Sequence, residues 1–134
     1  VVKASDEDLE WLYETSDIEQ AAESWLRRGV RLAVITRGEQ GATALTAKGR
    51  VDIPGVRVDV TDTVGAGDTF SAGILDALSR KGLLGAEGRE KIDQLEASEI
   101  KEILAHAALL ASVTVSRAGA NPPWTREIAD RCTL

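Results

Sequence analysis

The hydrophobic and polar positions along the chain predict two helices near its start. Ser5 is a good N-cap and is followed by acidic residues, and apolar residues then recur at helical spacing as far as Tyr13. A second apolar face at helical spacing predicts a helix over residues 18–28 that ends at Gly29. Residues 31–36 form a short apolar run bounded by turn residues, which is typical of a buried strand.

The pattern then changes to short strands joined by turns. After a glycine turn, residues 42–46 are predicted to form a strand, and a reversal at Lys48-Gly49 leads into a strand at residues 51–53. Valines alternate with polar residues over 56–60, which predicts a further, half-exposed strand.

Helices dominate the rest of the chain. The pattern predicts a helix over residues 69–80, a glycine-rich connection over 81–89, a long helix over 98–115 and a short closing helix over 124–131. Strands that alternate with helices favour an α/β fold whose sheet is mainly parallel.

Composition and charge narrow the function classes. The 134 residues suffice for one domain, and a net charge of −6 disfavours a nucleic acid or an anionic membrane as partner. No apolar run is long enough to cross a bilayer. The single cysteine, Cys132, cannot form an internal disulfide, which suits a reducing compartment. We therefore expect a cytoplasmic protein.

The most informative segment is DTVGAGDTF at residues 62–70, which runs directly into a helix. Gly65, Ala66 and Gly67 leave the backbone open to a ligand, and the amides of Ala66, Gly67 and Asp68 would lie at a helix N-terminus, which favours an anion. Asp68 at the rim of such a site is typical of a general base in phosphoryl transfer. The alternative is a glycine-rich turn in which Asp68 only caps the helix.

The stretch DTVGAGDTFSAG resembles the C-terminal signature, D-T-x-G-A-G-D, of the PfkB (ribokinase-like) carbohydrate kinases. The resemblance implies a ribokinase-like three-layer α/β/α fold and ATP-dependent phosphorylation of a small sugar. In that scheme Asp68 accepts the proton of a sugar hydroxyl, and the backbone of Gly65, Ala66 and Gly67 stabilises the transferred phosphoryl group. No P-loop motif is present.

Within that family, the tail SRAGANPPW and the signature together look most like bacterial fructokinases. Ribokinase and 2-keto-3-deoxygluconate kinase remain alternatives. Family members are longer and carry an N-terminal glycine signature that this sequence lacks. Residues 1–134 are therefore expected to be the C-terminal ATP-binding and catalytic portion of such a kinase, and to be inactive alone. The resemblance also implies that the full-length protein can form a homodimer. A non-catalytic nucleotide-binding fragment is the alternative from another class.

A second glycine loop, TRGEQG at residues 36–41, is similar to the nucleotide loop of the family, T-x-G-x-x-G. The similarity implies nucleotide contacts from Thr36, Gly38 and Gly41, although a plain hairpin turn would show the same residues. In the same way, Ala108 and Asn121 match positions beside the adenine.

Two metal sites follow from the resemblance alone. Ser5 and Asp8 occupy the positions of the motif N-x-x-E, with Ser in place of Asn and the shorter Asp in place of Glu. The acid of that motif is linked to magnesium through water, but a helix cap with a first-turn acid explains the same residues equally well. A potassium ion would be held by Asp62, the carbonyls of Val64 and Thr114, and the backbone at Gly119 and Pro123, where the alternative is a helix end followed by a proline stop.

The remaining chemical side chains are expected to be structural. His106 lies in an alanine- and leucine-rich helix with no second histidine, so a hydrogen-bonded structural role is favoured over metal binding. Packing roles are expected for Trp11, Trp25 and Trp124.

Overall fold

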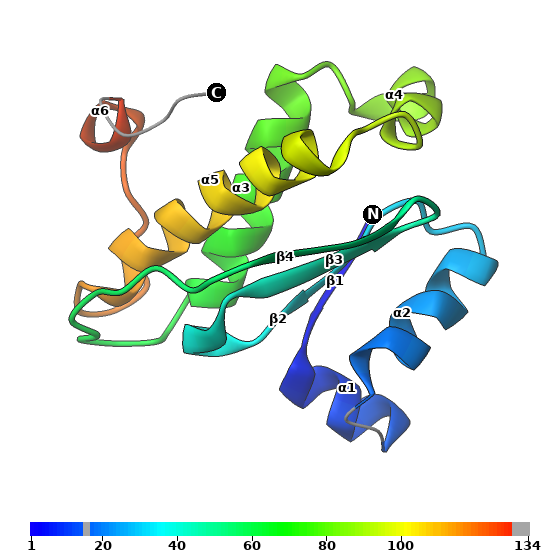
Figure 1. Cartoon of the computed structure of the whole chain (residues 1–134). Coiled ribbons are helices and arrows are strands. Elements are labelled where there is room, and N and C mark those ends of the chain that lie inside the picture. Colours follow the sequence, from blue (N-terminus) through cyan, green and yellow to red (C-terminus); the bar gives the residue numbers. More distant parts are fainter. Residues whose placement is uncertain (15–16, 130–134) are drawn as a thin grey trace.

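A four-stranded sheet lies at the centre of the protein. The computed structural model describes residues 1–14 and 17–129; Cys132 and the end of the expected closing helix lie outside them. The strands are β1 (Val2–Ser5), β2 (Ala33–Thr36), β3 (Ala42–Thr46) and β4 (Gly49–Ile53), and their spatial order is β1-β2-β3-β4 (Figure 1).

The sheet is mixed, and the expectation of a mainly parallel sheet was wrong. Strand β1 pairs with β2 in parallel, whereas β2 with β3 and β3 with β4 pair antiparallel. The reason is local: the turns at Gly38–Gly41 and Ala47–Lys48 are too short to hold a crossover helix, so each reverses the chain.

Helices cover both faces of the sheet. Helices α1 (Asp6–Tyr13) and α2 (Ile18–Arg27) lie on one side, and α3 (Ala66–Arg80) and α5 (Ala97–Val115) lie on the other (Figure 1). Helix α4 (Gly85–Ile92) connects α3 to α5, and α6 (Thr125–Ile128) follows near the end. This arrangement is the expected three-layer α/β/α architecture.

Strand alternation divides the core into two clusters. Val34 of β2 and Ala44 of β3 pack with the apolar residues of α3 and α5. Ile35, the next residue of β2, and Leu45, the next residue of β3, pack with the apolar residues of α1 and α2, including the buried Trp25. Because successive side chains point to opposite faces, one short sheet supports both helical layers.

Helices α3 and α5 pack with their backbones close together. A Cβ atom on Gly73 would lie 2.6 Å from the Cα atom of Ala107, so no larger residue fits there without movement. On the same interface His106 is buried, and its Nε2 atom lies 2.7 Å from Asp76 Oδ2. The structural role expected for His106 agrees with this contact.

Three further expectations were wrong. Residues 56–60 form no strand, because no neighbouring strand pairs with them within the described part of the chain. The expected connection over 81–89 contains the start of α4. Trp11 and Trp124 are 81% and 69% exposed rather than packed, and Arg126 lies over the Trp124 ring.

None of the helices in the described residues combines the length and the apolar character needed to cross a membrane.

Candidate active site

The first turn of α3 carries the residues expected to bind an anion. The helix begins at Ala66, three residues before the expected start, and its N-cap Gly65 has a positive φ of 80°. A Cβ atom on Gly65 would lie 2.9 Å from the Ala120 Cβ atom. Glycine at this position therefore permits both the left-handed turn and the close approach of the loop that follows α5.

Two backbone amides at this helix start are available, rather than the expected three. The amide of Ala66 donates to the Thr63 carbonyl oxygen at 3.2 Å. Within the described residues, the amides of Gly67 and Asp68 have no hydrogen-bond partner. Unpaired amides at a helix N-terminus favour a bound anion.

A cavity of about 620 Å³ lies beside this helix start. Its walls bring together Thr36, Gly38, Gly41 and Ala108 with Ala66 and Gly67, residues that are up to 72 positions apart in the sequence. A volume of this size suits a small organic ligand. Gly65, Asp68 and Asn121 do not line it, but Asp68 directly follows Gly67 and is exposed.

The apolar walls of the cavity were not anticipated as site residues. The irregular segment after β4, residues 54–60, contributes Val56, Val58 and Val60, and we call it the valine-bearing segment. Helix α5 contributes Ala111 and Val115. The alternation of valines in that segment was a signal, but it indicated a strand rather than a wall. Apolar side chains from two separate segments would suit contact with an aromatic ring.

Close backbone packing shapes the loop at residues 36–41. Arg37 donates its backbone N–H to the Gly41 carbonyl oxygen at 2.8 Å, which closes the turn. A Cβ atom on Gly41 would lie 2.1 Å from the Ile53 carbonyl oxygen, and one on Gly55 would lie 2.0 Å from that of Glu39. The loop therefore lies directly against the start of the valine-bearing segment.

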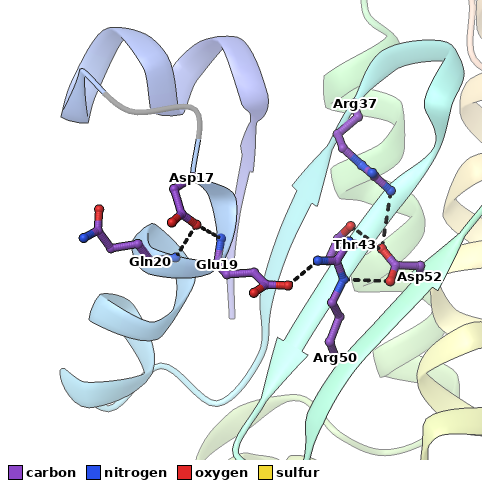
Figure 2. A network of polar contacts seen from close by, with 7 residues as sticks. All are labelled: Asp17, Glu19, Gln20, Arg37, Thr43, Arg50 and Asp52. Carbon is purple, nitrogen blue, oxygen red and sulfur yellow. Dashed lines mark hydrogen bonds and ion pairs between the residues drawn. The ribbon is translucent and has the colours of Figure 1, made fainter.

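A polar network on the α1/α2 side of the sheet anchors the same loop (Figure 2). The Asp52 carboxylate accepts hydrogen bonds from Thr43 Oγ1 at 2.6 Å and Arg50 Nε at 2.7 Å, and Arg37 Nη2 lies 3.4 Å away. Arg50 also pairs with Glu19 of α2. The hydrogen bond from Arg50 is the main reason why the pKa of Asp52 is lowered. Strand β4 thus links α2 to the base of the loop.

Asp62 joins the loop before α3 to the loop after α5. One carboxylate oxygen accepts the Val64 N–H at 3.0 Å, and the other accepts the Gly119 N–H at 2.9 Å. These two backbone hydrogen bonds hold the pKa of Asp62 below its ordinary value. The structure therefore brings three of the expected potassium ligands together through hydrogen bonds among themselves.

The other two expected potassium ligands are less well placed. The Thr114 hydroxyl donates to Thr69 Oγ1 at 3.0 Å, and the Thr114 carbonyl oxygen accepts the Arg117 N–H. No hydrogen bond among the described residues joins Pro123 to this group.

Ser5 and Asp8 form a capping box at the start of α1. Asp8 N–H donates to Ser5 Oγ at 2.9 Å, and Ser5 N–H donates to Asp8 Oδ2 at 2.8 Å. Hydrogen bonding from the Ser5 backbone, and then from its side chain, lowers the pKa of Asp8, so its exposed carboxylate is ionised at neutral pH. Within the described residues there is no group of three or more His, Cys, Asp or Glu side chains that could hold a metal ion.

Comparison with known proteins identifies the family. Residues 1–127 match the profile of the pfkB family carbohydrate kinases. The chain belongs to this family. It is also 50% identical over 84 residues to a fructokinase of Rhizobium leguminosarum bv. trifolii, a match that covers 63% of this chain and 26% of that protein. The expectation of a pfkB family member that resembles bacterial fructokinases is confirmed.

Solved structures of pfkB family members share the fold. Aminoimidazole riboside kinase from Salmonella enterica, complexed with aminoimidazole riboside and an ATP analog, has a TM-score of 0.74 at 30% identity over 98% of this chain and 41% of its own. A double-mutant fructokinase from Vibrio cholerae O395, in a fructose, ADP and potassium ion bound form, has a TM-score of 0.71 at 27% identity over 89% and 35%. This chain thus spans less than half of these relatives.

Proposed function

We propose that this chain is the ATP-binding and catalytic portion of a sugar kinase of the fructokinase type. The observation that carries the proposal is the single cavity shared by the glycine loop at residues 36–41 and the first turn of α3. Asp68 follows the last cavity residue of that turn. The nucleotide would lie between the valine-bearing segment and α5, with its phosphates directed toward Gly67.

The proposed reaction is a direct transfer of the γ-phosphoryl group. Asp68 accepts the proton as the sugar hydroxyl oxygen forms its bond to the γ-phosphorus atom. The bond to the β,γ-bridging oxygen breaks, and ADP leaves with that electron pair. The free amides of Gly67 and Asp68 stabilise the charge on the transferred group.

Magnesium bound to the phosphates would neutralise part of their charge. The ionised Asp8 is the acidic side chain that we assign to magnesium-bound water. Both oxygens of Asp62 already accept backbone N–H groups, so we assign no step of the reaction to a monovalent cation.

Replacement of Asp68 tests the proposal in the complete protein. We expect Asp68→Asn to reduce turnover by about 100-fold or more, while the Kd for ATP stays within about threefold, because the amide keeps the shape but cannot accept the proton. Glu90→Gln, the same chemical change on the exposed surface of α4, is the control. Unchanged turnover in Asp68→Asn would overturn the assignment.

A sugar panel decides between the possible substrates. Fructose is the substrate expected first, and ribose and 2-keto-3-deoxygluconate are the alternatives. Aminoimidazole riboside belongs on the panel because a kinase of that nucleoside has a similar structure. Nucleotide binding without phosphorylation of any of them would favour a non-catalytic nucleotide-binding fragment.

A further inference from the structure

Lys3 has a position that the proposed reaction does not yet explain. It lies in β1, the strand at one edge of the sheet. Its neighbours Val2 and Ala4 pack with the core cluster of α1 and α2. Because side chains alternate along a strand, Lys3 points to the opposite face, where α3 lies.

The Lys3 ammonium reaches the first turn of α3. A Cβ atom built on Gly67 would lie 3.1 Å from Lys3 Nζ, so the charge lies directly against the backbone of Gly67. A Cβ atom at position 67 would require the ammonium to shift by a few tenths of an ångström. The absence of a side chain there thus gives both a ligand and Lys3 access to the same amides.

The ammonium forms no ion pair or hydrogen bond in the described part of the chain, although it acts electrostatically on Asp8. Lys3 forms none of the ion pairs or side-chain hydrogen bonds found there. Its electrostatic effect on Asp8 is minor beside the two hydrogen bonds from Ser5. Lys3 is only partly exposed, and holding a flexible, charged side chain in such a place costs conformational and hydration free energy. An anion at the helix start would compensate for that cost.

We propose that Lys3 binds the phosphoryl group that is transferred from ATP to the sugar. This inference rests on the proposed function and adds a charged side chain to the backbone amides of Gly67 and Asp68. Gly67 is adjacent to the proposed base, so an ammonium beside it lies at the reacting end of the nucleotide rather than at the adenine. Lys3 therefore contacts the γ-phosphoryl oxygens and stabilises their charge as the bond to ADP breaks.

The experiment compares Lys3→Met, Lys3→Arg and a control, Lys101→Met, in the complete protein. Lys101 is an exposed lysine of α5, so its replacement changes the net charge equally at a distance from the site. For Lys3→Met we expect kcat to fall about 100-fold, the loss typical of a missing transition-state donor. The Kd for ADP, which lacks the γ-phosphoryl group, should stay within about twofold because the proposal places Lys3 at that group and not at the other phosphates. The kcat of Lys3→Arg should be about tenfold higher than that of Lys3→Met, since arginine restores the charge but not its position.

Each result has a distinct meaning. An active wild type with an equally active Lys3→Met variant would overturn the role of Lys3 while leaving the proposed function intact. Equal losses in kcat and in ADP affinity would also overturn it, because they would indicate a general disturbance of the cavity. A wild type that phosphorylates no sugar would instead overturn the proposed function. If Lys3→Met does not fold, Lys3→Gln is measured in its place, and its loss in kcat is compared with its loss in ADP affinity in the same way.

Discussion

At the scale of single residues, Gly38 and Gly41 lie in one loop and both have positive φ angles, 52° and 98°. They differ in the space around them. A Cβ atom on Gly38 would have no heavy atom within 4 Å, whereas one on Gly41 would lie 2.1 Å from a backbone oxygen. The sequence motif shows two equivalent glycines, but the structure assigns different reasons to each.

We therefore predict unequal effects of the same substitution. Gly38→Ala should reduce the free energy of unfolding by about 1 kcal/mol, the cost of a left-handed alanine. Gly41→Ala should cost about 3 kcal/mol, because overpacking against Ile53 adds to the backbone strain. Urea denaturation of both variants measures the difference. Equal midpoints would show that the loop relaxes away from β4.

Residue-level reasoning from the sequence found most of one wall of the cavity. Thr36, Gly38 and Gly41 were expected from the resemblance to the family's nucleotide loop, and Gly67 was expected from its place at a helix start; all four line the cavity. Lys3 could not be found in this way. A lysine in a strand has no motif of its own, and only the contact with Gly67, 64 positions further along the chain, gives it a chemical meaning.

At the scale of secondary-structure elements, helices were predicted best where an apolar stripe decides their position. The long helix was expected from residue 98 and begins at Ala97. Helix α4 was missed because Gly85 and Gly88 lower its intrinsic helix propensity. Packing compensates: a Cβ atom on Gly88 would lie 2.2 Å from the Leu83 backbone, and Ile92 is buried.

The contact between α3 and α5 makes stability depend on pH. Burial raises the pKa of Asp76, but hydrogen bonds from Arg80 and His106 outweigh it and leave the pKa below its ordinary value. A lowered pKa in the folded state stabilises the protein above the pKa of the unfolded chain, and this contribution disappears as the pH falls through the folded-state value.

We predict that Asp76→Asn reduces the free energy of unfolding by about 1 kcal/mol at pH 7, a modest value because the carboxylate is partly exposed. The difference from wild type should shrink below about pH 4, where the wild-type carboxyl itself takes up a proton. Denaturation at a series of pH values, with Glu90→Gln as a surface control, measures it. A difference that does not change with pH would contradict the ion-pair explanation.

At the scale of the whole molecule, apolar surface remains uncovered. Trp11, Leu12 and Tyr13 are exposed on α1, and the first and last strands of the sheet have no partner on their outer sides within the described chain. The three-layer order was predictable from the sequence. Strand direction was not, because it depends on whether each short turn reverses the chain.

We predict that the 134-residue chain alone self-associates or is only marginally stable, with a low Tm. Unpaired strand edges and exposed apolar patches favour association. Sedimentation velocity at several concentrations, together with thermal unfolding, tests this. A cooperative transition of a monomer at every concentration would show that the exposed surface is tolerated.

During synthesis of the chain, the cavity can form only at a late stage. Its walls begin at Thr36 and end at Val115, and the segments between them contribute the remaining surfaces. A ribosome that has released the chain only as far as α3 has exposed the glycine loop and the valines without the helix that covers them. The cavity therefore first exists when synthesis has passed α5, and until then these segments present an open apolar surface to the chaperones around the nascent chain.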